Sequence, residues 1–396
     1  MNNRILKIAV SLLAVLLLFS TNMANAAKID DIIASVKKMY APDSRTSVWT
    51  VTGKLQQVSD AYSVCVLSGK TDSREAKQEL LDALNKEGVA YLDSVQLLPD
   101  ASVEKPWALV SISVASIRYE ARSGAELASQ AIMGTPVKVL EHCGNGMTRV
   151  QTPDNYIGYV TDSSLAFFPE SEFDSWRTSG RYVVTSYQAT LFEKPDGDES
   201  AVVSDLVLGV ILQSDGERGK YVHLILPDGR SGYARKSDVA KFDKWAKQKF
   251  DVRLIEKNAR RMMGSPYLWG GMSTKMADCS GFVKTAYFSN GIILQRDASQ
   301  QALTGKSVDW RNWKKEAEAG DLIFVGTKSG RVTHVMMYLK DGKYIHSSGR
   351  VKINSMNPSD EDYLDYNILS MTRIKGQVGT KGIVAVESHP WYFMKK

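Results

Sequence analysis

The chain contains little of what metal-dependent and disulfide-stabilised proteins are built from. Its 396 residues include three cysteines and five histidines, with no Cys-x-x-Cys pair and no His-Glu-x-x-His run. Structural zinc sites need clustered Cys and His ligands. Many zinc peptidases bind their metal through the two histidines of a His-Glu-x-x-His motif, which lie on one face of a helix. The sequence therefore predicts a protein that uses neither a metal nor another cofactor.

The signatures of two further enzyme classes and of nucleic-acid binding are absent as well. There is no Gly-x-Ser-x-Gly elbow, as in serine hydrolases, and no glycine-rich phosphate loop. The formal net charge is +6, but the lysines and arginines form no dense block. A mild positive excess suits contact with an anionic cell surface, and we expect no nucleic-acid partner.

The N-terminus carries the features of a secretory signal peptide. Arg4 and Lys7 precede the apolar residues 8–19, and Ala24-Asn25-Ala26 supplies small residues at a cleavage position. The apolar run is too short for a comfortable membrane span, and no cysteine follows it that could carry a lipid, so we expect no stable membrane anchor. Residues 1–26 are predicted to be the signal peptide, and the mature chain is predicted to be a periplasmic or secreted monomer.

An odd number of cysteines in an exported protein leaves at least one thiol unpaired. Cys65 lies in a short apolar run and Cys143 lies beside a glycine, so these two either pair with each other or remain buried thiols. Both alternatives leave Cys279 unpaired, as a catalytic thiol must be.

The chain before residue 244 divides into three segments by its residue pattern. Residues 27–106 contain a helical stripe of leucines that stops at Gly88, and they predict a helical or α+β unit. Residues 107–170 and 178–243 instead contain short alternating strands separated by turn formers, which predict two small all-β barrels. The two series form an internal repeat of about 70 residues. Its matching stretches are residues 153–159 (PDNYIGY) and 227–233 (PDGRSGY).

Cys279 stands at the predicted start of a helix. Gly270 and Gly271 favour a loop before it, whereas apolar residues recur at helical spacing from Ser280 to Asn290. The free N–H groups and the positive end of the macrodipole at a helix N-terminus favour an anion. We therefore expect a lowered thiol pKa and interpret Cys279 as a catalytic nucleophile. The alternative is a buried cysteine that only packs.

A thiol nucleophile needs an imidazole to take its proton and a third group to orient that imidazole. His334 and His346 lie on two predicted strands that are joined through Lys340-Asp341-Gly342. A two-residue loop would place the imidazoles on opposite faces of the sheet, whereas a three-residue loop with a left-handed Gly342 makes them diagonal neighbours on one face. We predict the second register, with His334 as the base and His346 as the orienting group. The alternative is a pair of histidines that pack without catalysing.

The C-terminal segment contains six recognisable stretches around these residues. They are Tyr267–Gly271, Asp278–Phe282, Arg296-Asp297, Gly320–Phe324, Thr333–Val335 and Tyr344–Ser347. Together they resemble the NlpC-type family of papain-like cell-wall cysteine peptidases. The resemblance implies a papain-like α+β catalytic domain over residues 244–396, preceded by two SH3-like barrels, of which the second is interpreted as a spacer. The mature chain as a whole resembles the SH3-domain-containing γ-D-glutamyl-L-diamino acid endopeptidases.

The resemblance also implies roles for single residues. Cys279 would attack the carbonyl of the γ-D-glutamyl–diamino acid bond, and its backbone N–H, with Tyr267, would stabilise the oxyanion. The first SH3-like domain would read the free N-terminal amine of the peptide through Glu126 and Tyr156. The substrate-binding residues implied in this way are Glu126, Tyr156, Tyr267, Trp269, Asp278, Ser280 and Ser299.

The expected function is hydrolysis of that bond in free murein stem peptides, L-Ala-γ-D-Glu-diamino acid, with an unblocked N-terminal L-Ala, for cell-wall turnover or recycling. Alternatives on the same scaffold are an N-acetylmuramoyl-L-alanine amidase and an acyltransferase. An alternative from another class is a non-catalytic wall-binding adaptor. The intact set Cys279, His334 and His346 counts against the adaptor, and the amine-reading pair counts against the amidase.

Overall fold

The computed structural model describes residues 26–59 and 62–394, so the predicted signal peptide, apart from Ala26, lies outside the described residues. The chain divides into two compact units, with the division between Val103 and Glu104. Among the helices that the structure describes, none has both the length and the apolar character needed to cross a membrane.

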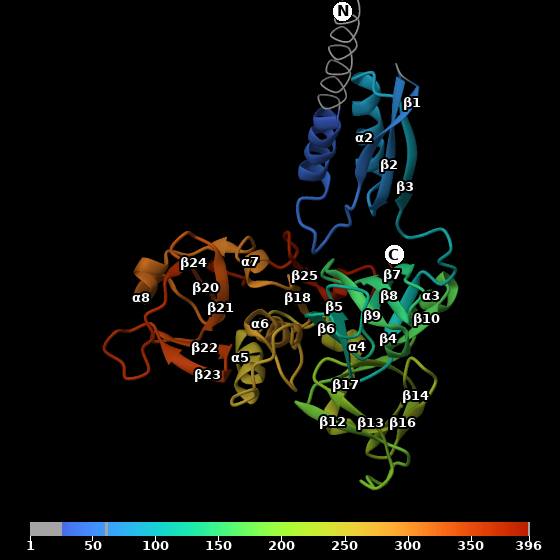
Figure 1. Ribbon diagram of the computed structural model, residues 1–396. Coiled ribbons are helices and arrows are strands. Elements are labelled where there is room, and N and C mark those ends of the chain that lie inside the picture. Colours follow the sequence, from blue (N-terminus) through green and yellow to red (C-terminus); the bar gives the residue numbers. More distant parts are fainter. Residues whose placement is uncertain (1–25, 60–61, 395–396) are drawn as a thin grey trace, which may run out of the picture. The chain divides into compact units, whose positions relative to one another are not determined.

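The N-terminal unit is a three-stranded mixed sheet with helices on one face (Figure 1). Its central strand β2 runs antiparallel to β1 and parallel to β3, and α2 provides the crossover that parallel strands need. Alternate side chains of β2, among them Cys65 and Leu67, are buried in the core of this unit. None of the predicted site residues lies here. The elements are the helical residues 26–40, β1 (Thr52–Ser59), β2 (Tyr62–Thr71), α2 (Arg74–Lys86) and β3 (Tyr91–Leu97).

The second unit begins with two seven-stranded sheets that repeat one topology. Their strand orders are β10-β4-β7-β8-β9-β5-β6 and β17-β11-β14-β15-β16-β12-β13, which correspond strand for strand. A short 3-10 helix precedes the last strand of each sheet, and this correspondence agrees with the predicted internal repeat. The first set comprises β4 (Trp107–Val110), β5 (Val114–Arg118), β6 (Leu127–Ile132), β7 (Pro136–His142), β8 (Met147–Gln151), β9 (Ile157–Thr161), η1 (Asp162–Ser164) and β10 (Leu165–Phe168). Helix α3 (Glu170–Thr178) leads to β11 (Arg181–Val184), β12 (Gln188–Phe192), β13 (Val202–Val207), β14 (Ile211–Arg218), β15 (Tyr221–Ile225), β16 (Ser231–Arg235), η2 (Lys236–Asp238) and β17 (Val239–Lys241).

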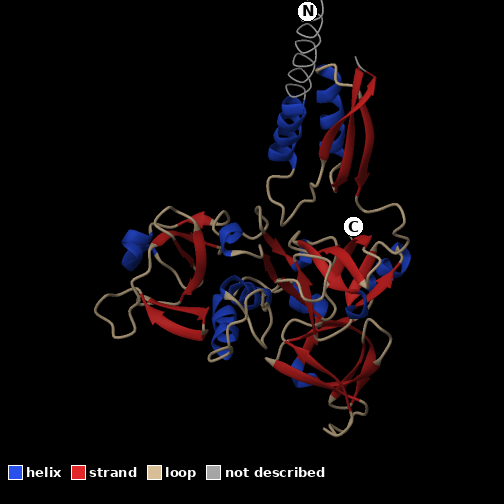
Figure 2. Ribbon diagram, in the orientation of Figure 1, coloured by secondary structure: helices blue, strands red, loops and turns tan. Residues whose placement is uncertain are grey.

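The C-terminal part packs helices against a six-stranded antiparallel sheet of order β19-β24-β20-β21-β22-β23. Strands dominate the two repeats, whereas helices and strands are mixed in this part (Figure 2). Its helices are α4 (Phe242–Ala246), α5 (Val252–Arg261), α6 (Cys279–Phe288), α7 (Ala298–Gln301), η3 (Trp310–Asn312), α8 (Trp313–Glu316) and η4 (Val386–Ser388). Its strands are β18 (Ile292–Leu294), β19 (Lys306–Ser307), β20 (Leu322–Gly326), β21 (Val332–Tyr338), β22 (Lys343–Ser348), β23 (Arg350–Ser355), β24 (Ile368–Arg373) and β25 (Ile383–Ala385).

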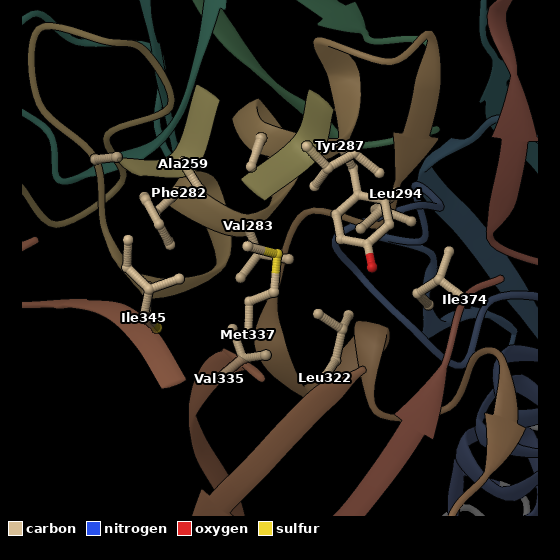
Figure 3. Packing of buried hydrophobic residues seen from close by; sticks show 14 of the residues in the cluster. Ala259, Phe282, Val283, Tyr287, Leu294, Leu322, Val335, Met337, Ile345 and Ile374 are labelled. Atoms are coloured by element: carbon tan, nitrogen blue, oxygen red, sulfur yellow. The ribbon is translucent and has the colours of Figure 1, made fainter. Parts of the chain in front are cut away.

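Helix α6 is buried against the middle of this sheet. Phe282 and Val283 share one apolar core with Val335, Met337 and Ile345 of β21 and β22 (Figure 3). Each of these five side chains is fully buried, so the helix has little freedom to shift along the sheet. The packing therefore fixes where the first residue of α6 lies relative to β21.

The hairpin of β21 and β22 has the predicted register. Met337 pairs with Ile345 and Tyr338 pairs with Tyr344, which is the pairing of a three-residue connection. Gly342 is left-handed with a φ of 80°, as predicted, and Asp341 is left-handed as well, with a φ of 53°. Glycine adopts this conformation without steric cost, and aspartate tolerates it better than most residues.

Buried polar contacts hold the first repeat against the C-terminal part. Lys284 Nζ lies 2.9 Å from Asp154 Oδ2, and the two side chains are 8% and 5% exposed. Lys284 also donates to the Leu294 carbonyl at 2.6 Å, and the Met272 N–H donates to the Gln130 side chain at 2.9 Å. Charges this deeply buried are tolerated only when they are paired and hydrogen-bonded. The first repeat is therefore docked directly on α6.

Candidate active site

Helix α6 begins at Cys279, as the sequence predicted. Asp278 is its N-cap: the side chain accepts from the Gly281 N–H at 2.7 Å, and the carbonyl accepts from the Phe282 N–H at 2.9 Å. A capping aspartate satisfies donors that the first helical turn leaves free. Cys279 is thus held at the positive end of a well-capped helix.

The surroundings of Cys279 raise the pKa of its thiol, contrary to the sequence prediction. Burial, and next the Asp278 carboxylate, raise this pKa to about 11, whereas the backbone N–H groups of Val335 and Ser280 hydrogen-bond to the sulfur and lower it by less. The side chain is only 7% exposed. The predicted lowering was wrong because it considered the helix terminus alone, while loss of solvation penalises the thiolate more strongly. At neutral pH Cys279 is therefore a thiol that needs a base.

This environment predicts slow alkylation of Cys279 at neutral pH. Because the thiolate is the reactive form, the rate of reaction with iodoacetamide should rise with an inflection above the ordinary thiol pKa of about 8.5. Peptide mass spectrometry across a pH series measures this rate separately for Cys279, Cys65 and Cys143. An inflection below 8.5 at Cys279 would show that the helix terminus outweighs burial after all.

His334 and His346 are brought into hydrogen-bonding contact. Nε2 of His334 and Nδ1 of His346 are 2.8 Å apart, and the ring centroids are 5.0 Å apart. His334 directly precedes Val335, whose N–H reaches the Cys279 sulfur, and the Asp278 carboxylate acts on the His334 imidazole, so His334 lies near the start of α6. Burial, and next His346, lower the pKa of His334 to about 3, and burial lowers the pKa of His346 to about 4. Both imidazoles are neutral at neutral pH, and His334 can take a proton as negative charge develops on the sulfur.

Asp278 and Ser280, which the sequence assigned to substrate binding, both contact the buried Arg296. Arg296 is 1% exposed, and it donates to the Asp278 carboxylate through Nη1 at 3.2 Å and through Nη2 at 2.6 Å. It also donates to the Ser280 hydroxyl at 3.0 Å and, through Nε, to the Ser129 hydroxyl of the first repeat at 2.8 Å. This network fixes the start of α6. A direct part for Asp278 or Ser280 in substrate binding stays a prediction.

Tyr156 of the first repeat reaches into the C-terminal part. Its hydroxyl donates to Asp297 at 3.4 Å and lies 3.3 Å from the Tyr119 hydroxyl. Asp297 caps the short helix α7, which also carries the half-buried Ser299. Glu126 is exposed, and within the described chain its carboxylate forms no hydrogen bond with Tyr156. Substrate contacts of Tyr156, Glu126 and Ser299 therefore stay predictions.

Tyr267 and Trp269 lie on the loop before α6. Tyr267 is half-buried, and burial, followed by the neighbouring Cys279 and Asp278, raises the pKa of its phenol. The phenol therefore stays a neutral hydrogen-bond donor close to the thiol. Trp269 is 59% exposed, so its ring is accessible to a ligand.

Four residues at this site received no individual role from the sequence: Arg296, Asp297, Tyr119 and Asn354. Arg296 and Asp297 stand in one of the recognised stretches, which was the available signal. Nothing in the local pattern distinguishes Tyr119 or Asn354 from surface residues. Asn354 lies on β23, and its Oδ1 is 3.1 Å from Nε2 of His346.

Comparisons with known proteins find relatives for the two parts of the chain that form this site. Residues 264–373 match the NlpC/P60 family, and residues 117–165 match the bacterial dipeptidyl-peptidase Sh3 domain. A gamma-D-glutamyl-L-lysine dipeptidyl-peptidase of Bacillus cereus is 28% identical over 236 residues, which cover 56% of this chain and 67% of the relative. Dipeptidyl-peptidase 6 of Lysinibacillus sphaericus is 28% identical over 262 residues, which cover 63% of this chain and 92% of the relative.

Two solved structures share the fold. An NlpC/P60 family protein from Bacillus cereus superposes with a TM-score of 0.56 at 23% identity, covering 67% of this chain and 99% of that one. An NlpC/P60 endopeptidase from Photobacterium damselae superposes with a TM-score of 0.50 at 16% identity, covering 74% of this chain and 76% of that one. These likenesses show a mixed α+β fold for the part of the chain that they cover.

Proposed function

We propose that this chain, a cell-wall cysteine peptidase whose residues 264–373 form an NlpC/P60 domain, hydrolyses the γ-D-glutamyl–L-diamino acid bond of free murein stem peptides with an unblocked N-terminal L-Ala. The observation that carries the proposal is a pair of contacts linked through the start of α6. The Val335 N–H, next to His334 in the chain, reaches the Cys279 sulfur, and Asp297, next to the Arg296 that binds Asp278, accepts from Tyr156 of the first repeat. The names of the two relatives, which specify dipeptidyl-peptidases and in one case a γ-D-glutamyl-L-lysine bond, support it. Export to the periplasm or the medium, and a part in wall turnover or recycling, belong to the same proposal.

The proposed chemistry is acyl transfer to the thiol followed by hydrolysis. His334 takes the proton of Cys279 as the sulfur attacks the γ-carbonyl, and it returns that proton to the amine of the departing diamino acid. Water then attacks the thioester, and the thiol leaves as the dipeptide acid forms. The backbone N–H of Cys279 and the Tyr267 phenol are the proposed donors to the oxyanion, because the first lies at the start of α6 and the second, on the loop before this helix, lies close to Cys279.

The free amine of the substrate is proposed to bind where the first repeat meets α7. Asp297 supplies a carboxylate there, and Tyr156 supplies a phenol whose pKa is raised by burial and then by Asp297, so it stays neutral. A carboxylate beside a neutral hydroxyl suits an ammonium group. Glu126, on the exposed loop before β6, is the proposed further carboxylate. An acetylated amine carries no charge and would form no ion pair with Asp297.

The test compares two peptides that differ only at this amine. The mature protein should release L-Ala-D-Glu from L-Ala-γ-D-Glu-diaminopimelate or from its L-lysine analogue, as read by mass spectrometry. The N-acetylated peptide should be cut at least about 100-fold more slowly, which corresponds to the loss of one desolvated charge contact. Equal cleavage of both peptides would refute amine recognition. Cleavage of intact sacculi without cleavage of either peptide would favour an amidase, and no cleavage of any kind would favour a wall-binding adaptor.

A further inference from the structure

Asn354 completes a chain of hydrogen bonds that begins at the candidate base. On β23, Asn354 pairs with Tyr344 and Lys352 pairs with His346, so Asn354 stands diagonally across from His346. Nε2 of His346 lies 3.1 Å from Asn354 Oδ1, while its Nδ1 contacts His334. Both nitrogens of His346 are therefore engaged.

The hydrogen bond of the Asn354 amide nitrogen sets the orientation of the amide group. Nδ2 donates to the backbone carbonyl of Asp362 at 2.9 Å, and an amide nitrogen cannot accept a hydrogen bond. The oxygen of the amide must therefore face His346, which requires a proton on Nε2 of that imidazole. A neutral imidazole carries one N–H, so Nδ1 of His346 is a bare acceptor.

The same argument applies to His334, the next residue in this series of hydrogen bonds. Because Nδ1 of His346 can only accept, Nε2 of His334 must donate to it. Neutral His334 then has a bare Nδ1, which is the one nitrogen left for the thiol of Cys279. When this atom takes the thiol proton, the imidazolium keeps its donation to His346, so no ring has to turn.

We propose that Asn354 is a positioning residue that fixes the tautomers of both histidines and thereby keeps Nδ1 of His334 free to accept the Cys279 proton. The catalytic meaning of this assignment rests on the proposed function, whereas the tautomers themselves do not. Without Asn354 the hydrogen bond between the two histidines can reverse its direction, with Nδ1–H of His346 donating to Nε2 of His334. The proton of His334 then sits on Nδ1, where it blocks transfer from the thiol.

The loop that orients Asn354 is itself anchored. The Asp362 carbonyl accepts a second hydrogen bond from the Ser355 N–H at 3.1 Å. Lys343 Nζ lies 2.6 Å from the Asp362 carboxylate and 2.7 Å from that of Asp360. The Ser355 N–H holds the Asp362 carbonyl and Lys343 holds its carboxylate, so the acceptor is fixed and the Asn354 amide keeps its orientation.

Several charged or titratable groups surround the histidine pair and enter its pH dependence. Lys352 lies across from His346 on β23, Tyr344 and Tyr366 contact the His346 ring, and Asp278 acts on His334 from the start of α6. Lys352 disfavours a proton on either imidazole, whereas Asp278 favours one on His334. A carboxylate in place of the Asn354 amide would add a second favourable charge, directly at His346.

The tautomers are tested directly by NMR of the full mature protein labelled with 15N-histidine, assigned through single His→Gln variants. In wild type, both His334 and His346 should show a protonated Nε2 and an unprotonated Nδ1 at neutral pH. Asn354→Leu, which keeps the size and removes the amide, should shift these signals toward a mixture. Asn367→Leu is the matched control, because the Asn367 amide donates to the carbonyls of Gly326 and Thr327 and touches neither histidine. A protonated Nδ1 on His346 in wild type would overturn the proposal.

Kinetics with the free tripeptide provide the second readout. Asn354→Leu should lower kcat about 10- to 100-fold with KM within about twofold, as expected for loss of an orienting partner. Asn354→Asp still accepts from Nε2–H, so it should retain most activity at neutral pH. It should also raise the pKa of His346, so that activity is lost at a higher pH than in wild type as the solution is acidified. The positioning role of Asn354 would be refuted if kcat were unchanged in Asn354→Leu and if Asn354→Asp lost activity at the same acidic pH as wild type. Complete inactivity of wild type toward the peptide would instead refute the proposed substrate. The NMR result would then still decide the tautomers.

Discussion

Replacing Cys279 by alanine should lower hydrolysis of the free tripeptide about 10⁵-fold or more, because it removes the sulfur that is proposed to form the acyl intermediate. The fold should survive, since the sulfur occupies a small buried site and alanine is a good helix former at the first position of α6. The measurement is kcat/KM by mass spectrometry of released dipeptide, with circular dichroism to verify the fold.

The matched controls are the other two cysteines. Cys65 is buried in the core of the N-terminal unit, and Cys143 follows β7 of the first repeat. Cys143→Ala should leave kcat/KM within about twofold, because ordinary substitutions away from a site change little. Activity that persists in Cys279→Ala, or that disappears in Cys143→Ala, would contradict the assignment of the nucleophile.

The start of α6 and the histidine hairpin could be predicted because both are encoded locally. Glycines before Cys279 and apolar spacing after it define a helix boundary within a few residues. A three-residue connection needs a left-handed residue at its third position, and Gly342 can supply it. The length of the connection fixes the strand register, and the register decides which side chains of the two strands share a face. The contact between His334 and His346 then needs no further information.

Contacts between segments far apart in the chain could not be predicted in this way. Tyr156 meets Asp297, and Ser129 meets Arg296, across more than a hundred residues of sequence. Local patterns carry no signal for such partners, because these contacts depend on how the first repeat docks on α6. The pKa of Cys279 was predicted in the wrong direction for the same reason: a helix terminus is a local feature, whereas burial comes from the surrounding fold.

Replacing Arg296 by methionine should have the largest effect on stability of any single change at this site. The substitution keeps an unbranched apolar chain but leaves the Asp278 carboxylate buried without its cation; the Arg296 and Asp278 side chains are 1% and 9% exposed in the intact pair. Breaking a buried ion pair in this way costs about 3–5 kcal/mol. Chemical denaturation of the mature protein followed by tryptophan fluorescence should show this loss in the transition of the second unit.

The control is an exposed pair of the same composition at a helix start. Asp251 caps α5 and contacts Arg253, whose side chain is 90% exposed. Arg253→Met should change the free energy of unfolding by less than about 1 kcal/mol, because water solvates the remaining carboxylate. Equal effects of Arg296→Met and Arg253→Met would mean that burial of the first pair contributes nothing.

A double variant separates the ion pair from the packing around it. Asp278→Asn keeps an N-cap for α6 and removes the charge that Arg296 neutralises, so Arg296→Met combined with Asp278→Asn should recover part of the stability lost in Arg296→Met alone. If the double variant is instead no more stable than Arg296→Met, the loss comes from the hydrogen bonds that Arg296 donates to Ser129 and Ser280. In the first outcome, Arg296 stabilises the fold mainly by neutralising the Asp278 carboxylate at the start of α6. In the second, Arg296 stabilises it mainly through hydrogen bonds that connect α6 to the first repeat.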